Sequence, residues 1–173
     1  MELRLATMAD LPRLRVVMDA AIAELQKGFL SEQQIESSRQ IMGLDTQLVE
    51  DGTYFVVEHD GEVVGCGGWS RRATLYGSDD TAGRDAHLLD PTDDAARVRA
   101  MYTDPRFARR GVGWMILRAC EEAAAAEGFT RMSLMSTLSG EPLYTAYGFE
   151  PVERITDDRG GAPVPLVRMR KSI

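Results

Sequence analysis

The sequence contains little cysteine or histidine and no long apolar run, which excludes several large classes of protein. Among its 173 residues are only two cysteines, Cys66 and Cys120, and two histidines, His59 and His87, and no histidine lies at ligand spacing from a cysteine. We therefore expect no metal site, and we expect both cysteines to be buried small apolar residues in a reducing compartment. No stretch of about 18 consecutive apolar residues occurs, and the start of the chain does not combine a basic segment with an apolar one. These absences predict a cytoplasmic protein without a membrane span.

Positive charge is also scarce. The 20 lysines and arginines are outnumbered by 27 aspartates and glutamates, which leaves a formal net charge of −7. This balance argues against a nucleic-acid surface and against an anionic membrane as partners, while an amine substrate is compatible with it. The length of 173 residues predicts one domain, residues 1–173, with a substantial core. The sequence leaves the oligomeric state open, including a homodimer.

Periodicity and turn residues divide the chain into helices and strands. A capping signal at Thr7 precedes apolar residues at helical spacing, and a second signal at Ser31 predicts a helix to about Met42. The pair Asp60-Gly61 predicts a tight hairpin turn between two strands. The predicted strands are 2–6, 54–59, 62–69, 97–103, 131–136, 149–155 and 164–169, and the later predicted helices are 112–128 and 142–146. Mixed strands around several helices predict an α/β or α+β sandwich.

Two details of this pattern bear on packing. Glycines at 65, 67 and 68 weaken the strand 62–69, and they predict a bulge or the close approach of another backbone. The helix 112–128 has apolar residues at helical spacing, and its predicted buried face comprises Val112, Met115, Ile116, Ala119, Ala123 and Ala126.

The most informative stretch lies between the strand 97–103 and the helix that follows it. The strand breaks at Pro105, and the chain enters the helix through Arg109-Arg-Gly-Val-Gly113. Backbone N–H groups at a helix N-terminus have no partner inside the helix and lie at the positive end of its dipole, so they bind phosphate groups. Glycine lets a phosphate approach the backbone closely, and Arg109 and Arg110 add positive charge. A tight turn formed only for packing is the competing interpretation.

Two other phosphate-binding motifs are excluded for this stretch. It is not a P-loop, because no Gly-Lys-Ser/Thr follows the glycines. It is not a dinucleotide-binding motif either, because the chain has no Gly-x-Gly-x-x-Gly after an N-terminal strand.

The stretch resembles the coenzyme A loop of the GNAT superfamily, the acyl-CoA-dependent N-acyltransferases, in which a strand and a proline precede Arg/Gln-x-x-Gly-x-Gly/Ala and a helix. A second match lies further along, where Tyr144 precedes Gly148-Phe149 as in the closing motif of the superfamily. The resemblance covers most of the chain and is weakest over residues 71–96. One departure is Ala108 at the leading Arg/Gln position of the loop, which leaves side-chain phosphate binding to the two arginines that follow. The resemblance implies a mixed, mostly antiparallel central sheet with a parallel, splayed pair, flanked by helices.

The same resemblance implies an acetyl-CoA site and its contacts. Coenzyme binding falls to the loop and to a strand edge whose backbone N–H groups polarise the thioester carbonyl. The loop residues are Arg109, Arg110, Gly111, Val112, Gly113 and Trp114, and the strand residues are Met101, Tyr102 and Thr103. Tyr144 is implied as the acid that protonates the departing thiolate, and an ordinary core tyrosine is the alternative. Tyr147 is the neighbouring candidate, but its position before a glycine favours packing of the turn.

The residues leave the general base open. Many relatives carry a glutamate in the strand before the loop, yet residues 97–103 contain no carboxylate. Glu24, Asp104, His87 or a water chain are candidates. A solvated surface position is the better interpretation of each of these side chains.

The segment 71–96 is also open to two interpretations. It is long and acidic, which is typical of a substrate lid and equally of a disordered insertion. Trp69 and Tyr76 are candidates for lining an acceptor pocket, with a role in the core or in anchoring the loop favoured for both.

These patterns predict an N-acetyltransferase that moves an acetyl group from acetyl-CoA directly to a primary amine of a small molecule or peptide. The alternative, from a different class, is a non-catalytic domain that binds acyl-CoA as a sensor or interaction module. The missing strand carboxylate keeps this alternative open, whereas Tyr144 argues against it.

Overall fold

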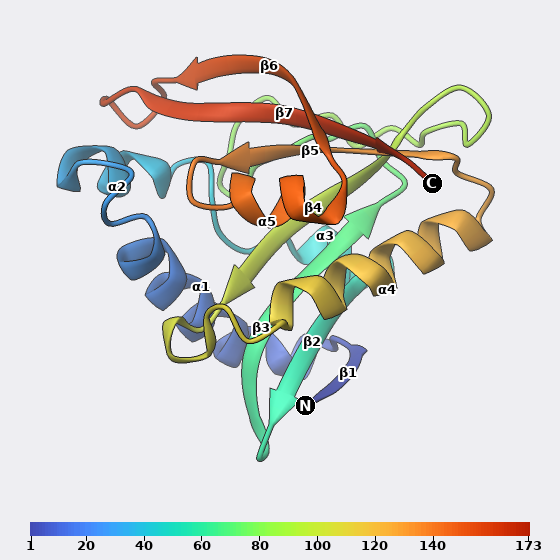
Figure 1. The fold of residues 1–173 in the computed structure, drawn as a ribbon, viewed down its shortest axis with the longest axis horizontal. Helices are drawn as coiled ribbons and strands as arrows, with labels where there is room; N and C mark the ends of the chain where they lie inside the picture. Colours follow the sequence, from blue (N-terminus) through green and yellow to red (C-terminus); the bar gives the residue numbers. More distant parts are fainter.

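The computed structural model describes residues 1–173 as one seven-stranded sheet flanked by helices (Figure 1). The strands lie in the order β1-β2-β3-β4-β5-β7-β6, and all neighbours are antiparallel except β4 and β5, which are parallel. The predicted mixed, mostly antiparallel sheet with one parallel pair is therefore confirmed. The strands are β1 (Glu2–Leu5), β2 (Tyr54–His59), β3 (Glu62–Ser70), β4 (Ala96–Thr103), β5 (Arg131–Thr137), β6 (Glu150–Asp157) and β7 (Val164–Ser172). The helices are α1 (Leu11–Leu25), α2 (Glu32–Ser38), α3 (Thr46–Glu50), α4 (Val112–Ala126) and α5 (Glu141–Tyr147), with 3-10 helices η1 (Met8–Asp10) and η2 (Pro105–Phe107).

The hairpin of β2 and β3 forms as predicted and buries both of its faces. Asp60 and Gly61 make the turn with φ angles of 50° and 79°, the left-handed values that a tight two-residue turn requires. Val56 and Val57 are both fully buried although adjacent strand residues point to opposite faces. Val57 packs in the core that includes α4, and Val56 packs in the core that includes α1. The sheet is thus covered by one long helix on each side (Figure 1).

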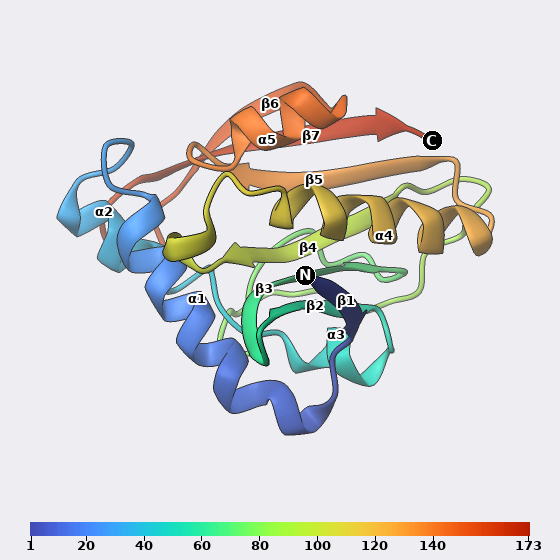
Figure 2. The same ribbon diagram turned by 60° about the horizontal axis from the view of Figure 1, so that its bottom comes forward.

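A bulge in β4 opens the sheet at the parallel pair. Two β4 residues, Ala100 and Met101, lie opposite the single residue Gly67 of β3, and Ala100 has a φ angle of 51°. A bulge bends its strand and increases the twist. Pairing of β4 with β5 is accordingly limited to residues 96–97 and 132–133, and the two strands then diverge toward their carboxyl ends (Figure 2). The implied splay of the parallel pair is confirmed.

The glycines of β3 permit close packing on both sides of that strand. A Cβ atom at Gly65 would lie 2.2 Å from Val112, and one at Gly68 would lie 2.3 Å from the carbonyl oxygen of Thr53. Helix α4 and strand β2 therefore approach β3 more closely than any other residue would allow. The predicted close approach is therefore present in β3. The strand also has a bulge at Val64, because Val57 and Glu58 of β2 pair with Gly65 and Val63.

Two sequence predictions were wrong in detail. The second helix ends at Ser38 instead of continuing to about Met42, and the short helix α3 was not predicted. On α4 the fully buried residues are Val112, Ile116, Leu117, Cys120 and Ala124, so the predicted face was rotated by about one position. Alanines occupy several sides of this helix, so apolar spacing alone does not select the buried side.

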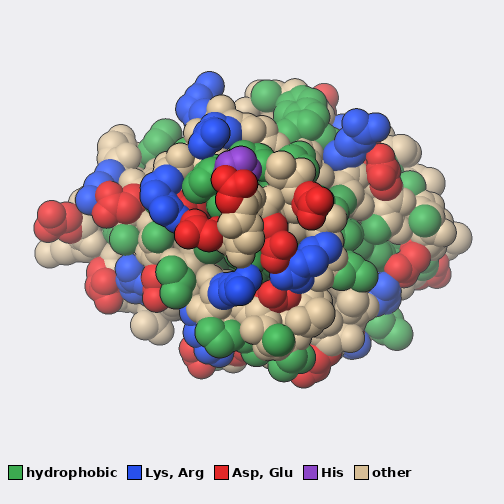
Figure 3. Space-filling view, turned by 90° about the horizontal axis from the view of Figure 1, so that it is seen from below, with side chains coloured by type: hydrophobic (Ala, Val, Ile, Leu, Met, Phe, Trp, Pro, Cys, Tyr) green, Lys and Arg blue, Asp and Glu red, His purple; other side chains and the backbone are tan.

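Charged side chains of both signs are mixed over the surface. The face in Figure 3 shows acidic and basic groups side by side without a large area of one sign. Ion pairs account for part of this pattern, as between Arg4 and Asp10 at 2.8 Å and between Arg106 and Asp104 at 2.9 Å. None of the helices combines the length and apolarity needed to cross a bilayer.

Candidate active site

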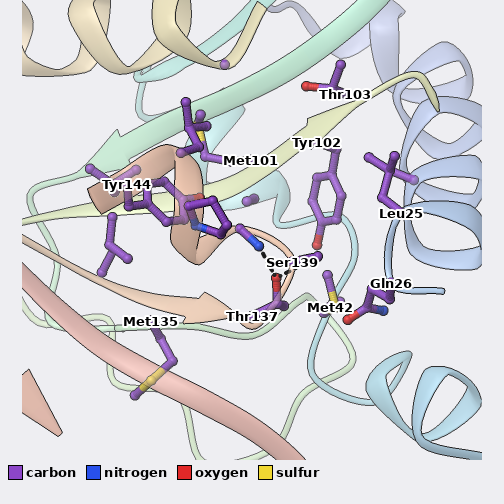
Figure 4. Close-up of a pocket in the computed structure, with 18 of the residues that line it drawn as sticks. Leu25, Gln26, Met42, Met101, Tyr102, Thr103, Met135, Thr137, Ser139 and Tyr144 are labelled. Atoms are coloured by element: carbon purple, nitrogen blue, oxygen red, sulfur yellow. Dashed lines mark hydrogen bonds between the residues drawn. The ribbon is translucent and has the colours of Figure 1, made fainter. Parts of the chain in front are cut away.

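A cavity of about 770 Å³ occupies the gap between β4 and β5. Of the 32 residues that line it, 21 are hydrophobic. They come from α1 and the turn after it, β4, the loop that leads into α4, the start of α4, β5, α5 and the turn before it, β7, and the segments 41–42 and 75–77. Figure 4 shows Tyr144 on one side of this cavity and Leu25 and Gln26 on the other, with Tyr102 between them. A cavity of this size, mostly apolar with a few polar groups, is typical of a small-molecule site.

The predicted phosphate-binding loop forms one wall of the cavity. Gly111 has a φ angle of 86° and Arg109 one of 60°, so the chain turns sharply before α4 begins. The first hydrogen bond of the helix runs from the N–H of Met115 to the carbonyl of Gly111 at 3.1 Å. The N–H groups before Met115 in this turn are therefore free, at the positive end of the helix dipole.

Glycine is required at positions 111 and 113 of the loop for two different structural reasons. No atom lies within 4 Å of a Cβ built at Gly111, so its backbone conformation and not lack of space demands glycine there. A Cβ at Gly113 would lie 2.6 Å from Cδ2 of Leu143, so this glycine lets α4 and α5 pack together. Packing thus explains the second glycine of the motif, whereas the first glycine shapes the free N–H groups.

The loop arginines are not engaged by carboxylates. Arg109 lines the cavity, and the guanidinium of Arg110 lies 4.9 Å from the ring centre of Phe107, a cation–π arrangement. Arg106 instead pairs with Asp104 and Glu62. The positive charge of Arg109 and Arg110 therefore remains available to an anionic ligand.

The β4 edge presents backbone groups to the gap at alternate residues. The N–H of Asp104 donates to the carbonyl of Val64 on β3 at 2.8 Å, so strand alternation directs the peptide groups of Met101 and Thr103 away from β3 and into the gap. The peptide group of Tyr102 faces β3 instead. Its side chain is buried on the α1 side of the sheet, and its hydroxyl accepts a hydrogen bond from the N–H of Gly43 at 2.8 Å.

Tyr144 projects from α5 into the cavity. Its ring is 8% exposed and packs against Phe149, with ring centres 5.9 Å apart. No protein group accepts a hydrogen bond from its hydroxyl, and burial raises the pKa of Tyr144 well above its usual value near 10, with smaller contributions from Tyr102 and Cys120. The side chain is therefore a neutral proton donor without an internal partner.

Tyr147, the neighbouring candidate, lies outside the cavity. Its hydroxyl donates to Glu121 of α4, and its ring packs edge-on against Trp114 with ring centres 4.8 Å apart. Lys171 lies over the same ring at 5.5 Å and pairs with Glu121 at 2.7 Å. Tyr147 thus joins α5 to α4 and β7, as its position before a glycine suggested.

None of the candidate general bases borders the cavity. Glu24 pairs with Lys27, Asp104 pairs with Arg106, and His87 contacts Asp85 on the surface. The lining includes two charged side chains, Arg99 and Arg109, and no carboxylate or imidazole. A proton can therefore leave the cavity only through water or through neutral polar groups.

The acidic segment 71–96 is held against the body of the protein. Arg84 pairs with Asp45 at 2.7 Å, and the hydroxyl of Tyr76 donates to Asp157 at 2.8 Å. Leu75, Tyr76 and Gly77 line the cavity. The disordered-insertion interpretation was therefore wrong for these residues. Trp69 is buried in the core against Phe129 and does not reach the cavity.

Two cavity residues were missed by the sequence analysis. Arg99 of β4 is almost fully buried, and it donates to Asp45 at 2.9 Å and to the carbonyl of Gly77 at 2.8 Å. Burial lowers the pKa of Arg99, although Asp45 opposes this. Gln26 follows α1 and is 2% exposed. The available signal was a polar residue four positions after Ile22, where the helical spacing calls for an apolar one.

Comparisons with known proteins agree with this geometry. The sequence model of the Acetyltransferase (GNAT) family matches residues 18–149, whereas no curated protein matches the chain. A GCN5-related N-acetyltransferase from Rhodopseudomonas palustris superposes with a TM-score of 0.73 at 19% identity, over 99% of this chain and 95% of that chain. A ribosomal-protein-alanine N-acetyltransferase from Brucella melitensis gives 0.68 at 18% identity over 100% of both chains. The PaiA N-acetyltransferase from Thermoplasma acidophilum, solved in complex with coenzyme A, gives 0.65 at 16% identity over 99% of this chain and 98% of that chain.

The structural neighbours establish the shared fold, and the family match covers most of the sequence. The resemblance read from the loop and from the closing motif is confirmed. The protein belongs to the GNAT family of acetyltransferases, and its cosubstrate is acetyl-CoA.

Proposed function

We propose that this acetyltransferase transfers the acetyl group of acetyl-CoA directly to a primary amine of a small molecule or peptide. The observation that carries the proposal is the pairing, in one cavity, of free N–H groups at the start of α4 with the unpartnered hydroxyl of Tyr144. The first group of donors suits a diphosphate, and the second suits a sulfur that gains negative charge. The acetyl thioester lies between them.

In this proposal, different parts of the cavity bind different parts of acetyl-CoA. Residues 109–114 bind the pyrophosphate, with Arg109 and Arg110 adding charge that salt screens. The peptide groups of Met101 and Thr103 bind the pantetheine arm and polarise the thioester carbonyl. Tyr102 contributes its side chain to the wall of the cavity.

The reaction balances without a covalent enzyme intermediate. The amine nitrogen forms a bond to the thioester carbon, and the carbon–sulfur bond then breaks. Tyr144 gives its proton to the departing thiolate. The proton lost by the amine leaves through water, because no carboxylate or imidazole lines the cavity, and water returns a proton to Tyr144 before the next turnover. The products are an N-acetylated amine and free coenzyme A.

A thiol-release assay with a panel of primary amines tests this function, with acetyl-CoA binding followed in parallel by calorimetry. We expect amine-dependent release of coenzyme thiol and a matching acetylated product by mass spectrometry. Binding of acetyl-CoA without release by any amine would contradict the proposal and favour the sensor alternative.

A further inference from the structure

One buried polar atom in the cavity has no partner. Gln26 is 2% exposed and lines the cavity, and its Oε1 is a buried side-chain oxygen that makes no hydrogen bond. Leaving a buried acceptor unpaired costs about 1–3 kcal/mol, so such an atom in a binding cavity calls for an explanation.

The orientation of this amide is determined by its neighbours. Nε2 of Gln26 donates to the carbonyl of Ile22 at 3.3 Å and to Oγ of Ser38 at 3.0 Å. The Ser38 hydroxyl uses its own proton for the carbonyl of Ile35 at 2.6 Å, so it can only accept from Gln26. A flipped amide would place Oε1 against two acceptors, so the oxygen must be the unpaired atom. In Figure 4 it lies on the side of Met42.

The wall around Gln26 is apolar and carries no negative charge. Its lining neighbours from α1 and from the segment up to residue 42 are Ala21, Leu25, Phe29, Ile41 and Met42. The two charged lining groups, Arg99 and Arg109, are both positive, and Arg99 is already satisfied by Asp45 and the carbonyl of Gly77. This wall therefore offers nothing to balance a second positive charge on an acceptor.

We propose, on the basis of the function proposed above, that the acceptor is a primary amine on an apolar body, and that Oε1 of Gln26 accepts a hydrogen bond from its amino group. An apolar site without a carboxylate disfavours the ammonium form, so it binds the neutral amine, which is the nucleophile. Gln26 acts as a positioning residue at the end of the cavity opposite Tyr144. Polyamines and other polycations are excluded, because their further ammonium groups would be buried without partners.

A matched pair of amines tests the substrate class. Hexylamine and 1,6-diaminohexane have the same chain length and differ by one ammonium group. With the wild-type enzyme we expect kcat/KM for hexylamine to exceed that for 1,6-diaminohexane at least about tenfold. Equal or better turnover of the diamine would overturn this inference and leave the proposed function intact. Absence of thiol release with both amines and with 2-phenylethylamine, while other amines of the panel react, would overturn the inference alone. Binding of acetyl-CoA without release by any amine of the panel would overturn both.

A pair of variants tests the role of the oxygen. Gln26→Met keeps the length of the side chain and removes Oε1, so kcat/KM for hexylamine should fall about 5- to 100-fold through KM, with KM for acetyl-CoA unchanged. Its thermal stability should fall no further than that of Ser38→Ala, because both variants lose the bond between Nε2 and Ser38, and removal of the unpaired buried oxygen offsets part of the loss in Gln26→Met. Ser38→Ala is the control, since it breaks the link between Gln26 and α2 but leaves the oxygen; it should lower stability and change KM for hexylamine less than twofold. An unchanged KM for hexylamine in Gln26→Met would show that the oxygen holds only an ordered water and would overturn the proposal. Equal KM effects in the two variants would reduce Gln26 to a structural link and would also overturn it.

Discussion

The substitution Tyr144→Phe separates the chemistry of this site from its packing. The ring stays against Phe149 at a centre distance of 5.9 Å, and only a hydroxyl without a protein partner is lost. We therefore expect the free energy of unfolding and the affinity for acetyl-CoA to change by less than about 0.5 kcal/mol. Turnover should fall about 10²- to 10⁴-fold, the effect of losing a positioned acid, which corresponds to about 2.7–5.5 kcal/mol of transition-state stabilisation.

The control for this substitution is Tyr147→Phe. That variant loses the hydrogen bond from Tyr147 to Glu121, so it should cost about 1 kcal/mol of stability and leave the rate nearly unchanged, because Tyr147 lies outside the cavity. Chemical denaturation and steady-state thiol release measure the two quantities on the same samples. In Tyr144→Phe, kcat and kcat/KM should drop together.

Either of two results would contradict the role of Tyr144 as the acid. One is full activity in Tyr144→Phe, and the other is a larger loss of rate in Tyr147→Phe. The pH profile provides an independent check. Burial raises the pKa of Tyr144 above its usual value near 10, so no loss of activity from its ionisation should occur below that pH.

Four further outcomes are expected. Gly111→Val should abolish acetyl-CoA binding in calorimetry, because the φ angle of 86° at this position is strained for a β-branched residue. Unchanged affinity would contradict the assignment of this loop as the pyrophosphate-binding site. Arg110→Ala should weaken acetyl-CoA binding, and the loss should shrink as salt concentration rises; a salt-independent loss would rule out the charge contribution. Arg84→Ala removes the ion pair between the segment 71–96 and Asp45, so kcat/KM for the amine should fall severalfold at unchanged acetyl-CoA affinity; an unaltered amine profile would argue against a role of the segment at the site. The Arg4 guanidinium lowers the pKa of Asp10 from 3.8 to about 2, so the stability from this pair is complete above pH 4 and is lost as the pH falls through 2; unfolding experiments should find a shallower decline in Asp10→Asn over that window.

Local signals in the sequence were sufficient for most of the secondary structure. Asp60-Gly61 identified the hairpin turn because few other pairs adopt its left-handed angles, and Gly128 marked the end of α4 with a φ angle of 94°. Gly111 was likewise identified as a loop glycine. Each of these residues determines the backbone conformation at its own position, so no knowledge of distant contacts was needed.

The sequence was less informative about why a given residue type is needed at its position, because that reason often depends on contacts with residues far along the chain. Gly113 was predicted as a phosphate contact, and the structure adds a separate reason for its lack of a side chain, the close approach of Leu143 thirty residues further on. The buried side of α4 was misplaced because alanine and apolar residues occur around much of the helix. The end of α2 at Ser38 was missed because Ser37 and Ser38 are held by distant partners, among them Gly160 and Gln26.

The sequence by itself thus determined the family and the order of the strands and of the two long helices, and it led to the predictions of a coenzyme loop at residues 109–114 and of Tyr144 in preference to Tyr147 as the acid. The tertiary structure alone decided which residues line the cavity. The bulge at Ala100 separates β4 from β5, and the gap then brings together α1, the segment 75–77 and α5, which lie far apart along the chain. Whether the oxygen of Gln26 is free depends on the directions of hydrogen bonds made by Ile22, Ser38 and Ile35. These hydrogen bonds form only when the helices pack, because in the unfolded chain the side-chain amide is hydrogen-bonded to water.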